Sequence, residues 1–319
     1  MNMPRKPRLD YPGLLYHVIA RGIERRIIFS DKKEYELFIS RLGEVLLATQ
    51  TPLYAFALLP NHVHLLVRRG GTPVATVMQR LLTSYAIRFN RRHKRNGHLF
   101  QNRYKGIVCQ DDAYFLELVR YIHLNPVRAG LVDSLAGLNG YPYTGHRLLT
   151  GRVKCEWFNK DPVLGLFGKT TKAACQAYLS FIEDGLLMGR RPEFSGGGLK
   201  RSKTLQEAGP QERWAYDERV LGDGSFVEAL LLAEETKAEK PRRAPEEVLG
   251  EVCAERGLTR ASLVGSAKAR EVVAARILLA SKLSLESGLK GAEIARILNT
   301  TDSAVSKMLA KAREGRKCG

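Results

Sequence analysis

The sequence lacks the features that define disulfide-rich, exported and membrane proteins. Its five cysteines are scattered and form no Cys-x-x-Cys pair, which indicates reduced thiols rather than a disulfide framework. No apolar run reaches the roughly 18 residues of a membrane span, and the basic N-terminus has no apolar region typical of an export signal. We therefore expect a soluble cytoplasmic protein with no membrane partner.

Acidic residues are scarce, and they are missing where basic residues gather. The 319 residues include 51 Lys and Arg against 33 Asp and Glu, a formal net charge of +18. Basic against acidic residues number 22 to 10 in residues 1–150, 16 to 16 in 151–250 and 13 to 7 in 251–319. Two basic regions around a neutral one are typical of two nucleic-acid-binding modules, although a basic surface kept for solubility would give the same counts.

Hydrophobic periodicity predicts a compact α+β domain in residues 1–150. The expected order is β-α-β-β-α-β-α, and the elements are a strand at 14–20, a helix from about 31, a hairpin of strands at 53–59 and 63–67, a helix at about 73–92, a strand at 104–109 and a helix at 111–124. Pro126 ends the last helix, because a proline disfavours the α conformation in the residue before it. This order predicts an antiparallel sheet with its helices on one side.

The rest of the chain divides by composition into two further regions. Residues 151–245 are expected to form a partly helical connection of unknown role, with linker-like stretches at 190–192 and 196–198. Residues 246–319 are expected to form an all-α domain.

Two histidines lie two positions apart in the second strand of the hairpin. Alternate side chains of a strand share a face, so His62 and His64 project together. Neighbouring imidazoles can hold one divalent cation through their neutral nitrogens. A pair of structural histidines in an ordinary strand would give the same pattern.

Tyr121 and Asn125 are four residues apart in the last predicted helix, so they lie on one helical face. This spacing directs a phenol and an amide oxygen toward one point, as a nucleophile and a metal ligand would require. A core aromatic residue and a helix-terminal asparagine would show the same spacing.

Four motifs in order resemble the HUH single-tyrosine transposases, and most closely the REP-associated tyrosine transposases of bacteria. They read YHVIARG at 16–22, LLPNHVHLLV at 58–67, GHLFQNRYK at 97–105 and LVRYIHLNPVRAGLV at 118–132. The resemblance implies a ferredoxin-like HUH nuclease domain at 1–150. It assigns His62 and His64 as metal ligands, Tyr121 as the nucleophile and Asn125 as the third ligand, a position where many relatives have Gln. It also implies Mg²⁺ or Mn²⁺ as cofactor. Separately, we expect the Tyr121 phenol to be surface-accessible.

The same resemblance implies cleavage and rejoining of single-stranded DNA near hairpins through a 5′-phosphotyrosine. A basic helix end and the segment after it supply candidate phosphate contacts, namely Arg88, Arg91, Arg92, Lys94, Arg95, Arg103 and Lys105.

The C-terminal region is similar to the DNA-binding domain of the bacterial replication initiator, with AREVVAARILLA at 269–280. A helix at 292–298, a polar turn and a helix from about 302 predict a helix-turn-helix that binds duplex DNA. Ser303, Ser306 and Lys307 would then face the DNA. A helical packing or dimerisation module is the alternative.

Three hypotheses for the function follow from these features. The first is an active transposase, the second is a sequence-specific DNA-binding regulator without catalysis, and the third is a relaxase or replication enzyme of the same chemistry. The intact set of His62, His64 and Tyr121 and the presence of one candidate tyrosine favour the first. The protein is expected to be a monomer or a homodimer.

Overall fold

The computed structural model describes residues 9–151, 153, 155–189, 191, 194, 219–238, 243–264 and 269–315. The linker-like stretch at 196–198 and residues 190 and 192 of the other stretch lie outside the described residues. The chain separates into two units, residues 1–234 and 235–319, and each is described by itself. Among the described residues, no helix is both long enough and apolar enough to cross a membrane.

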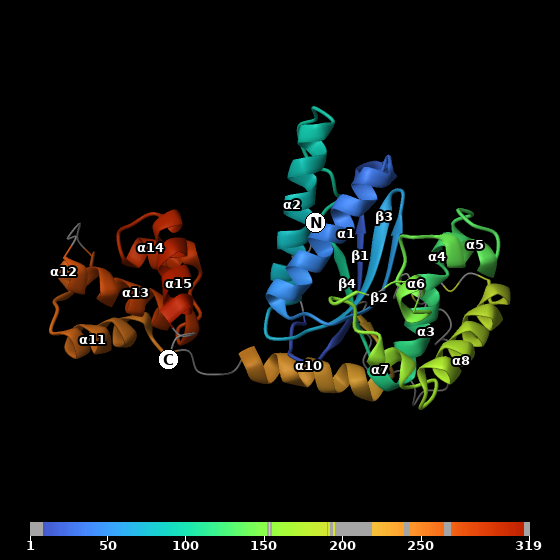
Figure 1. The fold of residues 1–319 in the computed structure, drawn as a ribbon. Coiled ribbons are helices and arrows are strands. Elements are labelled where there is room, and N and C mark those ends of the chain that lie inside the picture. Colours follow the sequence, from blue (N-terminus) through green and yellow to red (C-terminus); the bar gives the residue numbers. More distant parts are fainter. Residues whose placement is uncertain are drawn as a thin grey trace, which may run out of the picture. The chain divides into compact units, whose positions relative to one another are not determined.

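A five-stranded sheet organises the first unit, in the spatial order β2-β3-β1-β4-β5 (Figure 1). The strands are β1 (Leu15–Arg21), β2 (Leu53–Leu59), β3 (His62–Arg68), β4 (Lys105–Cys109) and β5 (Val220–Leu221). The first four are antiparallel to their neighbours and have the strand order of the expected ferredoxin-like fold. β5 is parallel to β4, so the sheet is mixed and the expectation of a purely antiparallel sheet is wrong at this edge. A strand of two residues is too short to give a periodic sequence signal.

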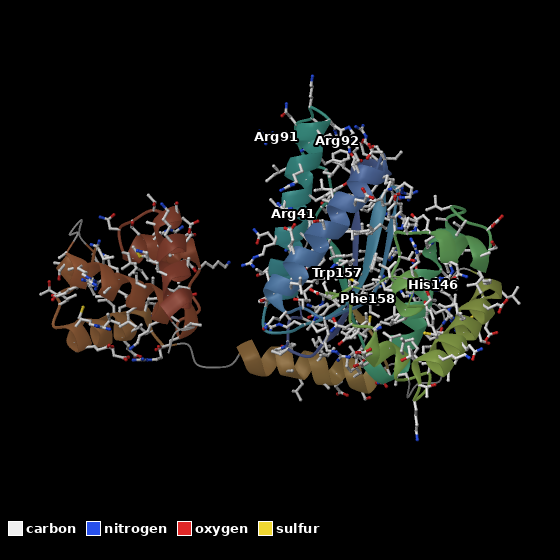
Figure 2. The ribbon with its side chains drawn as sticks, in the orientation of Figure 1. Arg41, Arg91, Arg92, His146, Trp157 and Phe158 are labelled. Atoms are coloured by element: carbon white, nitrogen blue, oxygen red, sulfur yellow. The ribbon has the colours of Figure 1, made fainter. Side chains whose placement is uncertain are left out.

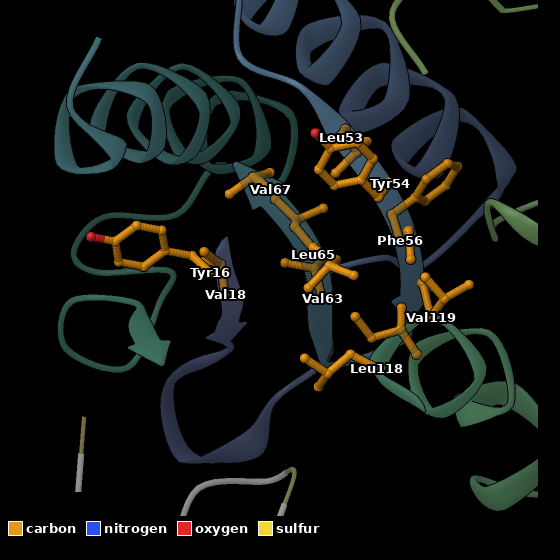
Figure 3. Packing of buried hydrophobic residues seen from close by; sticks show 14 of the residues in the cluster. Tyr16, Val18, Leu53, Tyr54, Phe56, Val63, Leu65, Val67, Leu118 and Val119 are labelled. Atoms are coloured by element: carbon orange, nitrogen blue, oxygen red, sulfur yellow. The ribbon is translucent and has the colours of Figure 1, made fainter. Parts of the chain in front are cut away.

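Helices cover both faces of this sheet, so the expectation of helices on one side only is also wrong. α1 (Lys32–Thr49) and α2 (Val74–Arg92) pack together on one face, and α3 (Asp111–His123) packs against β2 and β3 on the other (Figure 3). All seven residues of β2 are buried. A strand buried on both faces reads as a continuous apolar run, and β2 has this run, LYAFALL.

The hydrophobic core of the first unit continues past residue 150. The element η1 (Ile23–Arg25) lies between β1 and α1. The helices after α3 are α4 (Asn125–Arg128), α5 (Leu135–Gly140), α6 (His146–Leu149), α7 (Asp161–Leu164), α8 (Thr171–Asp184), η2 (Gly185–Leu187) and α10 (Gly224–Ala238). Phe158, Tyr178 and Phe194 are buried in the same core as the strands. Trp157 and Phe158 contact the ring of Phe56 in β2 (Figure 2). Part of the expected connecting region therefore belongs to the fold that carries the site.

A buried polar cluster ties α3, α6 and α8 together. The Nδ1 atoms of His123 and His146 each lie 2.8 Å from the hydroxyl of Tyr178. All three side chains are fully buried. His123, the last residue of α3, is therefore held inside this buried cluster.

The second unit is all-α, as expected. Its helices are α11 (Pro245–Arg256), α12 (Arg260–Val264), α13 (Arg270–Leu285), α14 (Gly291–Ile297) and α15 (Asp302–Gly315). It has its own core, to which α11, α13, α14 and α15 contribute Val248, Val252, Leu279, Leu283, Ile294 and Val305 among others.

Candidate functional site

β3 brings His62 and His64 to one face of the sheet, as their spacing predicts. The centroids of the two rings are 5.0 Å apart. His64 is buried between β1 and β2, which pair with β3 on either side, whereas His62 at the start of the strand is half-buried. This is the face that α3 covers.

Asn61 determines which ring nitrogen of His62 carries the proton. The amide nitrogen of Asn61 donates to the backbone carbonyl of Arg25 at 3.1 Å, so its amide oxygen faces His62 Nδ1 at 2.6 Å. An amide oxygen only accepts hydrogen bonds. His62 therefore carries its proton on Nδ1, which leaves the Nε2 lone pair available to a ligand.

A third histidine, His17 of β1, completes this cluster. Ile19 pairs with His64 in the antiparallel register, so His17 lies on the same face two positions away. Its Nε2 is 2.9 Å from His64 Nδ1, and the two rings stack with centroids 5.1 Å apart. Sequence reasoning missed this residue, although a polar side chain inside the apolar run LLYHVIA was an available signal.

Burial keeps these imidazoles neutral. It lowers the pKa of His17 to about 3 and that of His62 to about 4, and it holds the pKa of His64 well below its ordinary value. The charge of Arg21 adds to the lowering for His62 and His64. Neutral imidazole is the metal-binding form.

The donor set of the two strand histidines fits a divalent cation but is incomplete as it stands. In His62 and in His64, Nδ1 faces a neighbouring side chain, so Nε2 is the ligand atom available in each ring. No group of three or more His, Cys, Asp or Glu among the described residues could hold a metal ion. Two imidazole nitrogens are fewer ligands than a divalent cation takes, which leaves coordination positions for oxygen atoms.

Tyr121 of α3 lies against this histidine cluster. Its ring centroid is 6.0 Å from that of His64 and 5.8 Å from that of His17. Only 7% of the residue is exposed, because Phe194 packs on its ring at 5.3 Å. The expectation of an accessible phenol is wrong for this conformation.

Arg128 also contacts the ring of Tyr121. Its guanidinium carbon is 5.0 Å from the centroid of the phenol ring, and its Nη1 donates to the Tyr121 carbonyl at 3.1 Å. A cation held over the ring would favour a phenolate developing there.

Asn125 is buried one turn beyond Tyr121, where α3 ends. Its amide nitrogen donates to the carbonyls of Tyr121 and Ile122 at 3.0 and 3.3 Å. These are carbonyls that a helix end leaves without an intrahelical partner. No hydrogen bond joins Asn125 to His62 or His64 in the described part of the chain, so its assignment as third ligand stays a prediction.

A family model matches the part of the chain that carries this cluster. The family model described as IS200-like transposase matches residues 10–125. The matched segment contains β1–β4, α1–α3 and all of the residues expected to form the site, and the match supports a transposase-type DNA-processing function.

Two solved structures are similar to part of this chain. One is a REP-associated tyrosine transposase bound to a REP hairpin, with 17% identity, 47% of this chain and 87% of that chain covered, and a TM-score of 0.40. The other is a transposase from Deinococcus radiodurans, with 18% identity, 38% and 97% covered, and a TM-score of 0.28. A search of curated proteins found no match.

The end of α2 in the transposase domain carries the expected basic residues, and they differ in their contacts (Figure 2). Arg88, Arg91, Lys94 and Arg103 are exposed. Arg92 forms a bidentate ion pair with Asp31, so part of its charge is already compensated within the protein.

Two further cations belong to the transposase site. Arg21 is the register partner of His62 at the end of β1, and its charge reaches His62 and His64. Sequence reasoning gave Arg21 no role. Lys105 at the start of β4 pairs with Ile19, and its charge contributes to the lowered pKa of His17.

The expected DNA-contacting residues of the C-terminal unit lie on α15. Ser303, Ser306 and Lys307 are exposed, whereas Val305 between them is fully buried. α15 therefore packs into its own unit through one face and presents the three candidate residues on another. Asn299, with a φ of 49°, lies in the turn between α14 and α15.

Proposed function

We propose that this protein is a metal-dependent single-tyrosine transposase that cleaves and rejoins single-stranded DNA next to hairpins. The observation that supports it is the arrangement on one sheet face. His62 and His64 present free Nε2 atoms there, and the ring of Tyr121 lies against the second of them. A Mg²⁺ or Mn²⁺ ion held by these histidines, with Asn125 as third ligand, would polarise the scissile phosphate and offset charge in the transition state.

The chain's own groups would perform the transfer. The Tyr121 hydroxyl attacks the phosphorus, the bond to the 3′ oxygen breaks, and the phenol proton leaves as the 3′ oxygen gains one. The products are a 5′-phosphotyrosine and a free 3′-hydroxyl, which can reverse the step or join another strand. Arg128 stabilises the phenolate from one side of the ring, and Arg21 attracts the phosphate toward the histidines.

The DNA partners follow from the distribution of charge. The exposed cations Arg88, Arg91, Lys94 and Arg103, with Lys105 at the strand end, would contact the backbone of the single-stranded hairpin DNA. Arg92 and Arg95 would contribute less, because Arg92 is ion-paired with Asp31 and Arg95 packs over Phe89.

The C-terminal unit would bind duplex DNA as a helix-turn-helix, with Ser303, Ser306 and Lys307 on its recognition helix α15. Size-exclusion chromatography with light scattering would decide between a monomer and a homodimer. We expect the protein to act in the cytoplasm.

One observation favours a second function, a DNA-binding protein that does not cleave. The candidate nucleophile is 7% exposed and Phe194 packs on it, so DNA would have to displace this contact before reaction. A protein in which Phe194 never moves would bind DNA without forming a covalent intermediate.

Formation of a covalent adduct separates the two functions. Wild-type protein, a labelled single-stranded hairpin and Mn²⁺ should give a protein–DNA species that survives boiling in detergent. Tyr121→Phe should abolish it while DNA affinity changes by less than about two-fold, because only a hydroxyl is removed. Tyr114→Phe, seven residues earlier in α3, is the matched control and should retain the adduct. An adduct in Tyr121→Phe would refute the assignment of the nucleophile, and no adduct from wild type with any metal or hairpin would favour the binding protein.

A further inference from the structure

A groove runs between α2 and residues 97–104, the loop that leads into β4. Its volume is about 620 Å³, within the range of roughly 300–1,000 Å³ typical of sites for small organic groups. Met78, Ala86, Asn90, Phe100, Arg103 and Tyr104 are among the residues that line it.

The loop wall of the groove is anchored to the strand end that carries the catalytic cluster. Ile23 N donates to Leu99 O at 2.9 Å, and Gln101 N donates to Arg21 O at 2.8 Å. Arg21 is the register partner of His62. The helix wall is joined to the loop through Asn90, whose amide nitrogen donates to Gly97 O at 2.8 Å. The groove is therefore preformed, and its loop wall is fixed to the strand end beside the proposed metal ligands.

The lining combines apolar surface with groups that can hydrogen-bond to a flat polar ring. Met78, Ala86 and Leu99 supply the apolar part, and Phe100 and Tyr104 supply aromatic rings. The amide oxygen of Asn90 is buried without a hydrogen-bond partner among the described residues. A buried acceptor without a partner costs free energy, which a donor on a bound group would recover.

The charge around the groove selects a polyanion. The chain has no Asp or Glu between Glu44 and Asp111, a segment that includes every residue lining the groove. Exposed Arg88, Arg91 and Arg103 flank or line it. These arginines would attract the phosphate backbone of a nucleic acid, and the groove itself is suited to an apolar ring with polar edges.

We propose that this groove holds an unpaired base of the single-stranded DNA next to the cleaved phosphate. The base stacks on Phe100 or Tyr104 and donates a hydrogen bond to the Asn90 amide oxygen, as amide side chains do toward base edges. The neighbouring phosphates contact Arg103 and the basic end of α2. The inference rests on the proposed function for its substrate class, and it adds the site that holds the strand in register with the catalytic cluster.

Filling the groove tests this assignment without any need for catalysis. All variants are made in the Tyr121→Phe protein, so binding is measured even where cleavage is absent. Thr83→Trp places a large ring in the groove from the exposed surface of α2, where Thr83 is a lining residue. Ser40→Trp is the matched control, since Ser40 is an exposed hydroxyl residue on α1, outside the groove.

Fluorescence anisotropy with a hairpin carrying single-stranded extensions gives the affinities. Thr83→Trp should weaken binding about ten-fold or more, in the range that follows from losing one stacked base, with the slope of affinity against salt unchanged. Ser40→Trp should bind as the parent does. Equal affinity of Thr83→Trp and the parent would overturn the proposal, and so would an equal loss in both variants.

Photocrosslinking locates the base directly. Oligonucleotides with 5-iodouracil at successive unpaired positions are irradiated with the Tyr121→Phe protein, and the modified peptide is identified by mass spectrometry. One position should crosslink to Phe100 or Tyr104, and Thr83→Trp should remove that product. Crosslinks confined to other residues would overturn the groove assignment, whereas failure of the covalent-adduct experiment would overturn only the enzyme function.

Discussion

His17 is expected to control metal binding although it is not a proposed ligand. If His64 binds the cation through Nε2, its Nδ1 carries the proton and donates to His17 Nε2, 2.9 Å away. His17→Phe keeps a ring of similar size in a fully buried position. It removes the Nε2 acceptor together with Nδ1, which is buried without a hydrogen-bond partner among the described residues. The variant therefore tests the hydrogen bond rather than the packing.

The expected loss of metal affinity can be estimated from the buried group that loses its partner in the variant. His64 Nδ1–H would be buried without a partner, at a cost of about 1–3 kcal/mol. Loss of an outer-shell partner of a metal-binding histidine typically weakens metal affinity by about 10- to 100-fold, which is ~1.4–2.7 kcal/mol. The two estimates agree. His17→Gln should restore part of the affinity, because its side-chain oxygen can accept the same hydrogen bond.

Mn²⁺ titration followed by electron paramagnetic resonance measures this affinity, since the signal of free Mn²⁺ falls as the ion binds. A long-range ¹H–¹⁵N spectrum of the metal-free protein gives the tautomer of His64, which should have its proton on Nδ1 in the wild type. Equal Mn²⁺ affinity in wild type and His17→Phe would refute the reasoning. A His64 proton on Nε2, or a His17→Gln variant no better than His17→Phe, would contradict it as well.

Two further predictions concern stability and the C-terminal unit. Burial lowers the pKa of His17 to about 3 and of His62 to about 4, so below about pH 6.5 the unfolded chain binds more protons than the folded one. The free energy of unfolding, measured with urea, should therefore fall as the pH falls from 6.5 toward 4. It should depend less on pH in His17→Phe. An equal slope of the free energy of unfolding against pH in both proteins would argue against buried, neutral histidines. In α15, Lys307→Ala should weaken duplex binding across sequences and reduce the salt slope by about one while the covalent adduct forms normally. Arg256→Ala, an exposed cation of α11, is its control, and unchanged duplex binding by Lys307→Ala would favour the packing module.

Local periodicity explains why the strand and helix positions could be predicted from the sequence. His62 and His64 share a face because side chains alternate along any strand, and Tyr121 and Asn125 align because four residues complete about one helical turn. These relations depend on neighbouring backbone geometry alone. The spatial order β2-β3-β1-β4 is that of the ferredoxin-like fold, which the resemblance to the HUH transposases implied.

The tertiary structure decided which of these residues meet others far away in the chain. His17 contacts His64 across 47 positions because β1 pairs with β3 in one register, and a shift of one residue would turn His17 to the opposite face. Phe194 covers Tyr121 from 73 positions away, and β5 joins the sheet edge from residue 220. Such contacts form only in the complete fold. Bringing distant segments together costs conformational entropy, and only the packing of several segments into one core offsets that cost. The sequence alone therefore identified the candidate site residues, and the closed fold determined the partner of each histidine and the burial of Tyr121.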